Sequence, residues 1–245
     1  MKFLKISFLL FFCIAINAVT VDTGHANVSL VKFEDVQGDQ NKSLIGIRMD
    51  MQENWHTYWK NPGDSGGPIK VKWSHNENVS ISDIYWPTPS LIPYEPLMTY
   101  GYKNFVIFPF EIINTNNKNS FIEASIDFLI CDDICVPEKA LIKTNLYEIE
   151  TDESLFDWFL KVPAQTLPAK VLLEKDFINI RFSWPFEVTS AIFFVDDQYI
   201  VEHASDQILT KEENNYLLKV KRTGDLPLPS NLLGVISINN DESFV

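Results

Sequence analysis

Hydrophobic and polar residues alternate along much of this 245-residue chain with the two-residue period of β-strands. In the clearest run, 122–130, an isoleucine, alanine or phenylalanine occupies every even position, and the positions between are mostly polar. Such alternation is typical of a strand with one face in a core and the other in water. Strands are therefore predicted over this run and over 43–51, 69–73, 105–113 and 140–149.

Helical periodicity is weak, and the one predicted helix, 154–160, has an acidic start and ends before Pro163. After Pro168 the strand pattern resumes over 170–173, 177–184, 191–199, 216–220 and 233–238. Many short strands separated by Pro, Gly, Asn and Asp clusters favour antiparallel sandwiches over a parallel α/β sheet. We predict an all-β protein with two sandwich units in tandem, 27–162 and 163–245, joined by a hinge in KVPAQTLPAK.

The first 26 residues are predicted to be a signal peptide. Lys2 and Lys5 precede an almost wholly apolar run, and small residues suited to cleavage follow near Ala18 and Ala26. The run is short for a bilayer span, so an uncleaved anchor is the weaker alternative. Cys13 lies inside the run and is expected to leave with the peptide.

The charge of the chain excludes one class of partner. Cleavage at Ala18 would remove two lysines and leave 33 acidic against 18 basic side chains, a formal charge of −15. A chain this acidic is repelled by phosphate backbones, so we predict that it binds no nucleic acid.

Cys131 and Cys135, in the stretch LICDDICVPE, would be the only cysteines left after cleavage. Strand-like segments flank CDDIC, so a hairpin would place the two thiols opposite each other, within reach of a disulfide. A ring this short stabilises a fold by only about 2 kcal/mol, so a structural staple is a weak explanation. Redox exchange, a static disulfide and a metal site stay open. A site for Cu(I) or zinc would have to be completed by His56, His75 or His203, which show no ligand spacing.

Acidic residues surround the pair. Asp132, Asp133 and Glu138 are predicted to disfavour a thiolate, because a neighbouring negative charge raises the pKa of a thiol. The thiols would then react slowly until a partner docks and changes their environment. This pattern suits a partner-specific electron relay better than a general oxidant.

An aromatic stretch, WHTYWKNPGDSGGP, precedes the cysteines by about 60 positions. Its Asn-Pro-Gly and Gly-Gly-Pro triplets are typical of turns, and Trp55 and Trp59 are expected to pack in a core.

Three stretches, NWHTYWKNPGDSGGPIKVKW, YEPLMTYGY and the strand leading to CDDICVPE, occur in this order. Together they resemble the N-terminal periplasmic domain of the thiol:disulfide interchange protein DsbD, and more closely its ScsB-like branch, over about residues 28–245. The resemblance implies immunoglobulin-like sandwiches in the periplasm of a Gram-negative type of cell. It implies a protein-disulfide reductase or thiol–disulfide exchange component, a chemistry that also serves cytochrome c biogenesis. Electrons would pass from a membrane-embedded thiol reductant of the DsbD or CcdA type to periplasmic thioredoxin-like proteins.

The resemblance also assigns roles to residues. Cys135 would form the mixed disulfide with a partner, Cys131 would resolve it, and no cofactor would be needed, because the cysteines are the redox centre. A cap loop would shield the pair, and its counterparts here are Met98, Thr99, Tyr100 and Gly101. The stretch LMT departs from the acidic and phenylalanine residues of the DsbD cap. Nothing in the chain resembles the transmembrane or thioredoxin-like parts of DsbD. Two alternatives are a non-catalytic β-sandwich adaptor or chaperone-like module with a static disulfide, and a Cu(I)-handling protein.

Overall fold

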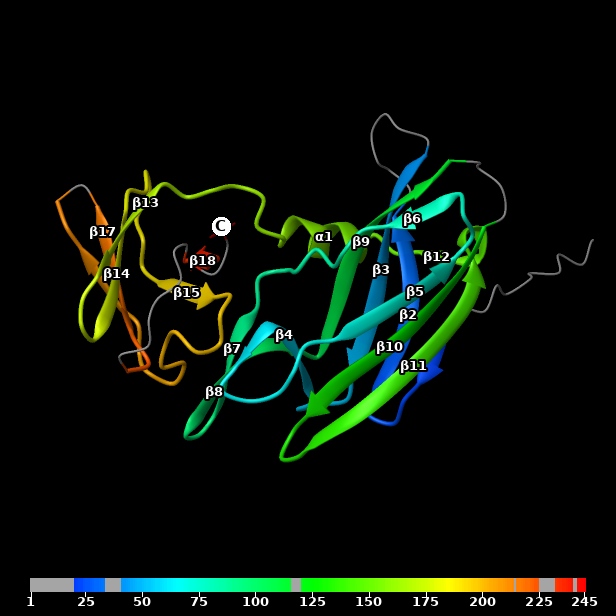
Figure 1. Ribbon diagram of the computed structural model, residues 1–245, viewed down its shortest axis with the longest axis horizontal. Helices are drawn as coiled ribbons and strands as arrows, with labels where there is room; N and C mark the ends of the chain where they lie inside the picture. Colours follow the sequence, from blue (N-terminus) through cyan, green and yellow to red (C-terminus); the bar gives the residue numbers. More distant parts are fainter. Residues whose placement is uncertain (1–19, 34–40, 116–119, 214, 225–231, 240–241) are drawn as a thin grey trace, which may run out of the picture.

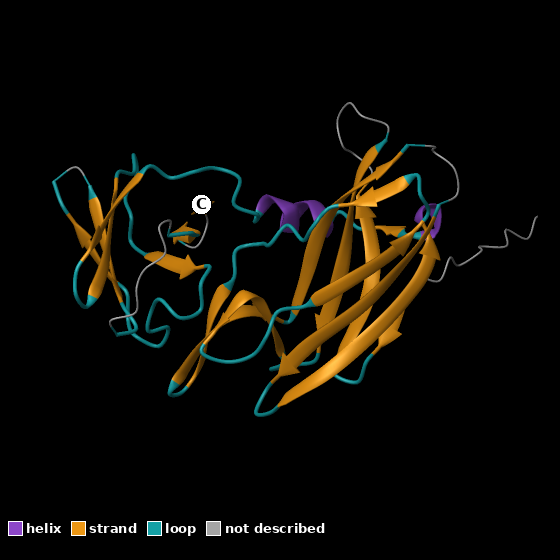
Figure 2. Cartoon of the chain, viewed as in Figure 1, coloured by secondary structure: helices purple, strands orange, loops and turns teal. Residues whose placement is uncertain are grey.

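The computed structural model describes residues 20–33, 41–115, 120–213, 215–224, 232–239 and 242–245. These residues form strands almost throughout, in antiparallel sheets. Figure 1 shows a larger group of sheets from the blue-to-green part of the chain and a smaller group from its yellow-to-red part. Figure 2 shows the same view with the strands in orange. The predicted all-β fold of tandem antiparallel sandwiches is confirmed. The predicted signal peptide lies, up to residue 19, outside the described residues.

The first unit contains two sheets that face each other across one core. One sheet has the order β1 (Thr20–Asp22), β2 (Ala26–Phe33), β3 (Lys42–Met51), β9 (Phe105–Asn114) and β6 (Val79–Ile81), with β12 (Glu150–Thr151) beside β2. The other has the order β11 (Cys135–Asn145), β10 (Phe121–Cys131), β4 (His56–Gly63), β8 (Leu97–Lys103) and β7 (Ser90–Tyr94), with β5 (Lys70–His75) beside β10.

The core of this unit follows from the alternation seen in the sequence. Every even-numbered residue of β10 from 122 to 130 is buried, and the odd-numbered residues between them are half-buried. The helix α1 (Ser154–Leu160) has the predicted bounds and buries Leu155 and Trp158. Trp59 is completely buried in the same core, as predicted, whereas Trp55 is half-buried and stacks on His25.

The second unit is a smaller sandwich with its own core. Its sheets are β13 (Ala169–Leu173), β14 (Phe177–Phe182), β17 (Tyr216–Lys221) and β16 (Ile208–Lys211), and β15 (Ala191–Val195), β18 (Gly234–Ile238) and β19 (Glu242–Phe244). The core between them includes Ile178, Phe182 and Leu218. The chain crosses from the first unit to the second between α1 and β13. The boundary expected at 162–163 falls in this connection and stays a prediction.

Two predicted strands end four residues earlier in the structure. The one predicted over 140–149 is the end of β11, which stops at Asn145 because the 3₁₀ turn Leu146–Glu148 follows. The one predicted over 191–199 stops at Val195, where the Asp197 carboxylate accepts a hydrogen bond from the Tyr199 amide and turns the chain. Among the described residues, no helix is both long and apolar enough to cross a membrane.

Candidate functional site

The two cysteines face each other at the end of a long hairpin. Cys131 is the last residue of β10, Cys135 is the first of β11, and they are direct partners in the strand pairing. Residues 132–134 form the connecting loop, and a disulfide joins the cysteines with their Cα atoms 4.2 Å apart. The predicted hairpin and its local disulfide are therefore confirmed.

The two cysteines differ sharply in exposure. Cys131 is 1% exposed, because β10 also pairs with β4 at His56 and lies between two neighbouring strands. Cys135 is exposed, because it opens β11, an edge strand of this sheet. A molecule that approaches from solvent therefore meets the Cys135 sulfur first.

Tyr58, on β4, points its hydroxyl at the exposed cysteine. Its oxygen lies 3.4 Å from Cys135 Sγ, and it is the donor because a disulfide sulfur carries no hydrogen. The side chain is buried, and Gly66 lies so close that a Cβ there would be 2.2 Å from the tyrosine ring. Burial raises the pKa of Tyr58 to about 12, so the hydroxyl keeps its proton at neutral pH.

His56 lies edge-on to Tyr58, with ring centroids 5.2 Å apart. Burial lowers the pKa of His56, the charge of Lys103 lowers it further, and Asp132 acts in the opposite direction. The imidazole is therefore neutral at neutral pH and adds no positive charge beside the sulfurs.

The β7–β8 hairpin reaches the cysteine loop through its tip. The Tyr94 hydroxyl donates a hydrogen bond of 3.1 Å to the Asp133 carbonyl oxygen. In Figure 1 the ends of the β7–β8 and β10–β11 hairpins both lie at the bottom of the molecule. This is the one hydrogen bond that the described residues show between the β7–β8 hairpin and the loop of the cysteines.

The four predicted cap residues lie on β8, behind that tip. Met98 is half-buried, Thr99 donates to the Ile92 carbonyl oxygen, and Tyr100 is completely buried. Gly101 is pressed against β4, since a Cβ there would lie 2.1 Å from the Thr57 carbonyl oxygen. Their role as a cap over the cysteines stays a prediction.

Comparison with known proteins connects this geometry to a family. Residues 27–146 match the family model described as thiol:disulfide interchange protein DsbD, N-terminal. This segment, just under half of the chain, is similar to the DsbD N-terminal domain family. The matched segment contains both cysteines, Tyr58 and the β7–β8 hairpin, so the DsbD-type region and the site coincide.

A solved structure has the same fold over nearly the whole chain. It is the crystal structure of the N-terminal periplasmic domain of ScsB from Proteus mirabilis, with a TM-score of 0.70 and 18% sequence identity. The match covers 93% of this chain and 95% of that chain, so the second sandwich is included. No curated protein sequence matches the chain.

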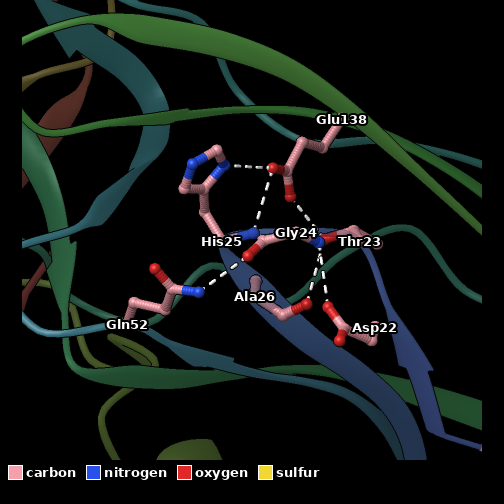
Figure 3. Close-up of polar contacts among 7 residues, drawn as sticks. All are labelled: Asp22, Thr23, Gly24, His25, Ala26, Gln52 and Glu138. Atoms are coloured by element: carbon pink, nitrogen blue, oxygen red, sulfur yellow. Dashed lines mark hydrogen bonds and ion pairs between the residues drawn. The ribbon is translucent and has the colours of Figure 1, made fainter.

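Glu138, one of the acidic residues predicted to disfavour a thiolate, is buried, and its carboxylate is bound by Thr23 and His25. Its carboxylate accepts hydrogen bonds from the Thr23 hydroxyl and from the His25 backbone amide, and it pairs with His25 Nδ1 at 2.6 Å (Figure 3). Gly24 allows this turn, because its φ of +114° is one that other residues rarely adopt. Glu138 therefore ties the β1–β2 connection to β11 close to Cys135.

The histidines considered as metal ligands do not converge. His75 contacts the carbonyl oxygen of Asn76 at the surface, and His203 bonds to Tyr100 and Gln198. In the part of the chain that the structure describes, no three His, Cys, Asp or Glu residues group as a metal site would require. The candidate reactive group of this site is the Cys131–Cys135 disulfide.

Neither Tyr58 nor Tyr94 stands out in the sequence as a site residue. Tyr58 is 77 positions from Cys135, and β4 shows no alternation, because seven of its eight residues are buried. Only the pairing of β4 with β10 and β8 brings the hydroxyl to the sulfur. No signal in the sequence alone marks either tyrosine.

Proposed function

We propose that the chain relays reducing equivalents by thiol–disulfide exchange at Cys131 and Cys135. The donor would be a membrane-embedded thiol reductant of the DsbD or CcdA type, and the acceptors would be thioredoxin-like proteins of the periplasm. The match of residues 27–146 to the DsbD N-terminal family model supports this class of chemistry. The difference in exposure between Cys131 and Cys135 carries the assignment of their roles.

The exchange proceeds in two balanced steps. In the reduced protein, the Cys135 thiolate attacks one sulfur of a partner disulfide, forms a mixed disulfide and releases the other partner sulfur as a thiolate. Cys131 then loses its proton and attacks Cys135 Sγ, which frees the remaining partner thiolate and forms the Cys131–Cys135 disulfide. Two electrons pass to the partner, and the membrane reductant restores the dithiol by the same chemistry in reverse.

Tyr58 supports the first step. A hydrogen bond to a charged group contributes about 1.5–3 kcal/mol, so its hydroxyl stabilises the Cys135 thiolate over the thiol. A solvent-exposed carboxylate nearby, such as that of Asp133, opposes this by about 1 kcal/mol or less. The tyrosine therefore outweighs an exposed acidic neighbour of the kind expected to suppress the thiolate.

The β7–β8 hairpin serves in this proposal as the cap, with Met98, Thr99, Tyr100 and Gly101 at its base and Tyr94 at its contact with the cysteine loop. One hydrogen bond between exposed residues stabilises a contact by about 1 kcal/mol, so a docking partner can displace it. The cap then restricts approach to Cys135 until a partner with a matching surface binds.

Trapping of the mixed disulfide tests the proposal. With Cys131→Ala, the exchange stops after the first step, and a covalent complex through Cys135 should accumulate with a thioredoxin-like partner. The matched variant Cys135→Ala should trap little, because the remaining sulfur is buried. Complexes are separated by non-reducing electrophoresis, and the joined peptides are identified by mass spectrometry. A complex formed only by Cys135→Ala would reverse the roles, and no complex with either variant would contradict the relay.

A further inference from the structure

The second unit contacts the first at the strands that carry Tyr58 and the base of the cap. Ile192 and Val235 pack on the core of the first unit. A further part of the contact is made by residues 194–203, which follow one another at the end of β15 and in the turn after it. They lie against β4 and β8. Phe194 packs edge-on against Trp59 and Tyr100, with ring centroids 6.2 and 5.0 Å away, and joins the core of the first unit.

Polar contacts fix this interface in one register. The Asn61 side-chain amide donates to the Val195 carbonyl oxygen at 2.7 Å, and the Gln198 side-chain amide donates to the Gly63 carbonyl oxygen at 2.6 Å. Lys60 and Asp196 form an ion pair of 2.7 Å. Asn61 is 2% exposed, so a shift of the units would leave its amide buried without a partner, which is costly.

A buried histidine completes the contact. His203 Nε2 lies 2.7 Å from the Gln198 carbonyl oxygen, which only accepts, so this nitrogen carries a proton and donates it. His203 Nδ1 lies within hydrogen-bond distance of the Tyr100 hydroxyl, at 2.9 Å. Burial, with a contribution from the charge of Asp64, raises the pKa of Tyr100, so the hydroxyl remains a donor.

A chain of contacts leads from this interface to Tyr58 and the Cys135 sulfur. The loop that follows Gly63 is held to β8 by the hydrogen bond from the Asp64 amide to the Met98 carbonyl oxygen and by the bond from the Met98 amide to the Asp64 carboxylate. Two residues further on, Gly66 contacts the Tyr58 ring, and Tyr58 reaches Cys135. On the same ladder, Tyr58 is the direct strand partner of Gly101, the neighbour of Tyr100.

We propose that the second unit holds Tyr58 against Cys135 through this interface, with Gln198 and His203 as positioning residues for thiol exchange. Neither residue touches a sulfur, and both act through β8 and the loop 63–66. The biological meaning of this role rests on the proposed exchange at Cys135. The second sandwich is then a support for the reactive site of the first, and its loss would change the chemistry of a cysteine that it does not contact.

The test measures Cys135 alone and needs no partner protein. All variants carry Cys131→Ala, and the rate of Cys135 alkylation by iodoacetamide is followed against pH by mass spectrometry of the Cys135 peptide. Gln198→Leu combined with Tyr100→Phe removes both hydrogen bonds and keeps the tyrosine ring in place. The matched control is Gln207→Leu with Tyr216→Phe, which removes a glutamine bond to the Phe193 backbone and a tyrosine hydroxyl within the second unit.

At pH 7, Cys135 of the interface variant should be alkylated at least about threefold more slowly than Cys135 of the control. The limiting rate at high pH should be the same in both. In a Tyr58→Phe background the interface changes should have no further effect, because the contact that they position is already absent. Equal alkylation rates in the interface variant and the control would overturn the proposal. A further loss of rate when the interface changes are added to Tyr58→Phe would overturn it too. Tyr100→Phe alone, which retains the ring packing, gives the same comparison if the combined variant does not fold. Failure of the proposed relay would appear separately, as absence of a trapped partner.

Discussion

Tyr58→Phe removes one oxygen atom from the environment of Cys135 and leaves the ring beneath Gly66. The hydroxyl is a donor at neutral pH, because burial raises the pKa of Tyr58 to about 12. A hydrogen bond donated to a thiolate favours the charged form, so its removal raises the pKa of the Cys135 thiol. A loss of about 1.5–3 kcal/mol corresponds to a rise of roughly 1–2 pKa units. Below its pKa the thiol then contains about 10- to 100-fold less thiolate.

The pH dependence of Cys135 alkylation in the Cys131→Ala protein measures this shift. The Tyr58→Phe curve should move to higher pH and reach the same plateau once the thiol is fully ionised. Thermal unfolding serves as a control, since a curve that moved only because the fold loosened would also change its plateau. An unchanged curve, or one displaced to lower pH, would refute the claim that Tyr58 stabilises the thiolate.

Three further predictions concern the frame of the site. Gly66→Ala should lower the free energy of unfolding by about 1–3 kcal/mol in urea titrations, because the new methyl group meets the Tyr58 ring; Gly224→Ala, also at positive φ but with nothing within 4 Å, should cost less. Glu138→Ala should cost about 1–3 kcal/mol, because it removes the acceptor of the His25 amide and one acceptor of the Thr23 hydroxyl, whereas Glu123→Ala, which removes a half-exposed ion pair with Lys143, should cost less than about 1 kcal/mol. Equal losses within either pair would contradict the packing described here. Sequencing of the mature N-terminus should show cleavage near Ala18, since a start at Asn27 would remove Thr23 and His25 from Glu138.

A strand can be predicted from local sequence where one of its faces is buried and the other is exposed to solvent. The strand β10 is predictable for this reason, because buried and half-buried residues alternate along it. The strands β3 and β9 and the helix α1 are also predicted close to their observed bounds, although residues 106–110 of β9 are all buried. The strands β4, β7 and β8 are not. The first is buried on both faces, and the hairpin formed by the other two has its pattern set by contacts with β4 and with the second unit.

The site divides in the same way. The Cys131–Cys135 hairpin is predictable, because the strands, the acidic loop and the spacing lie within one short stretch of sequence. The Tyr58 contact and the bond between Tyr100 and His203, which are 103 positions apart, depend on how distant strands are paired. Glu138 shows the converse: its proximity to the cysteines in sequence suggests an effect on the thiols, but the β1–β2 turn binds its carboxylate.

The reduction potential of the Cys131–Cys135 pair tests the central claim most directly. It is measured by equilibration with defined ratios of reduced to oxidised dithiothreitol or glutathione, and the two redox forms are separated after acid quenching. A relay requires a potential in the range of the catalytic oxidoreductases, from about −270 to about −120 mV. A value below about −300 mV would show a structural bond and contradict the proposed exchange.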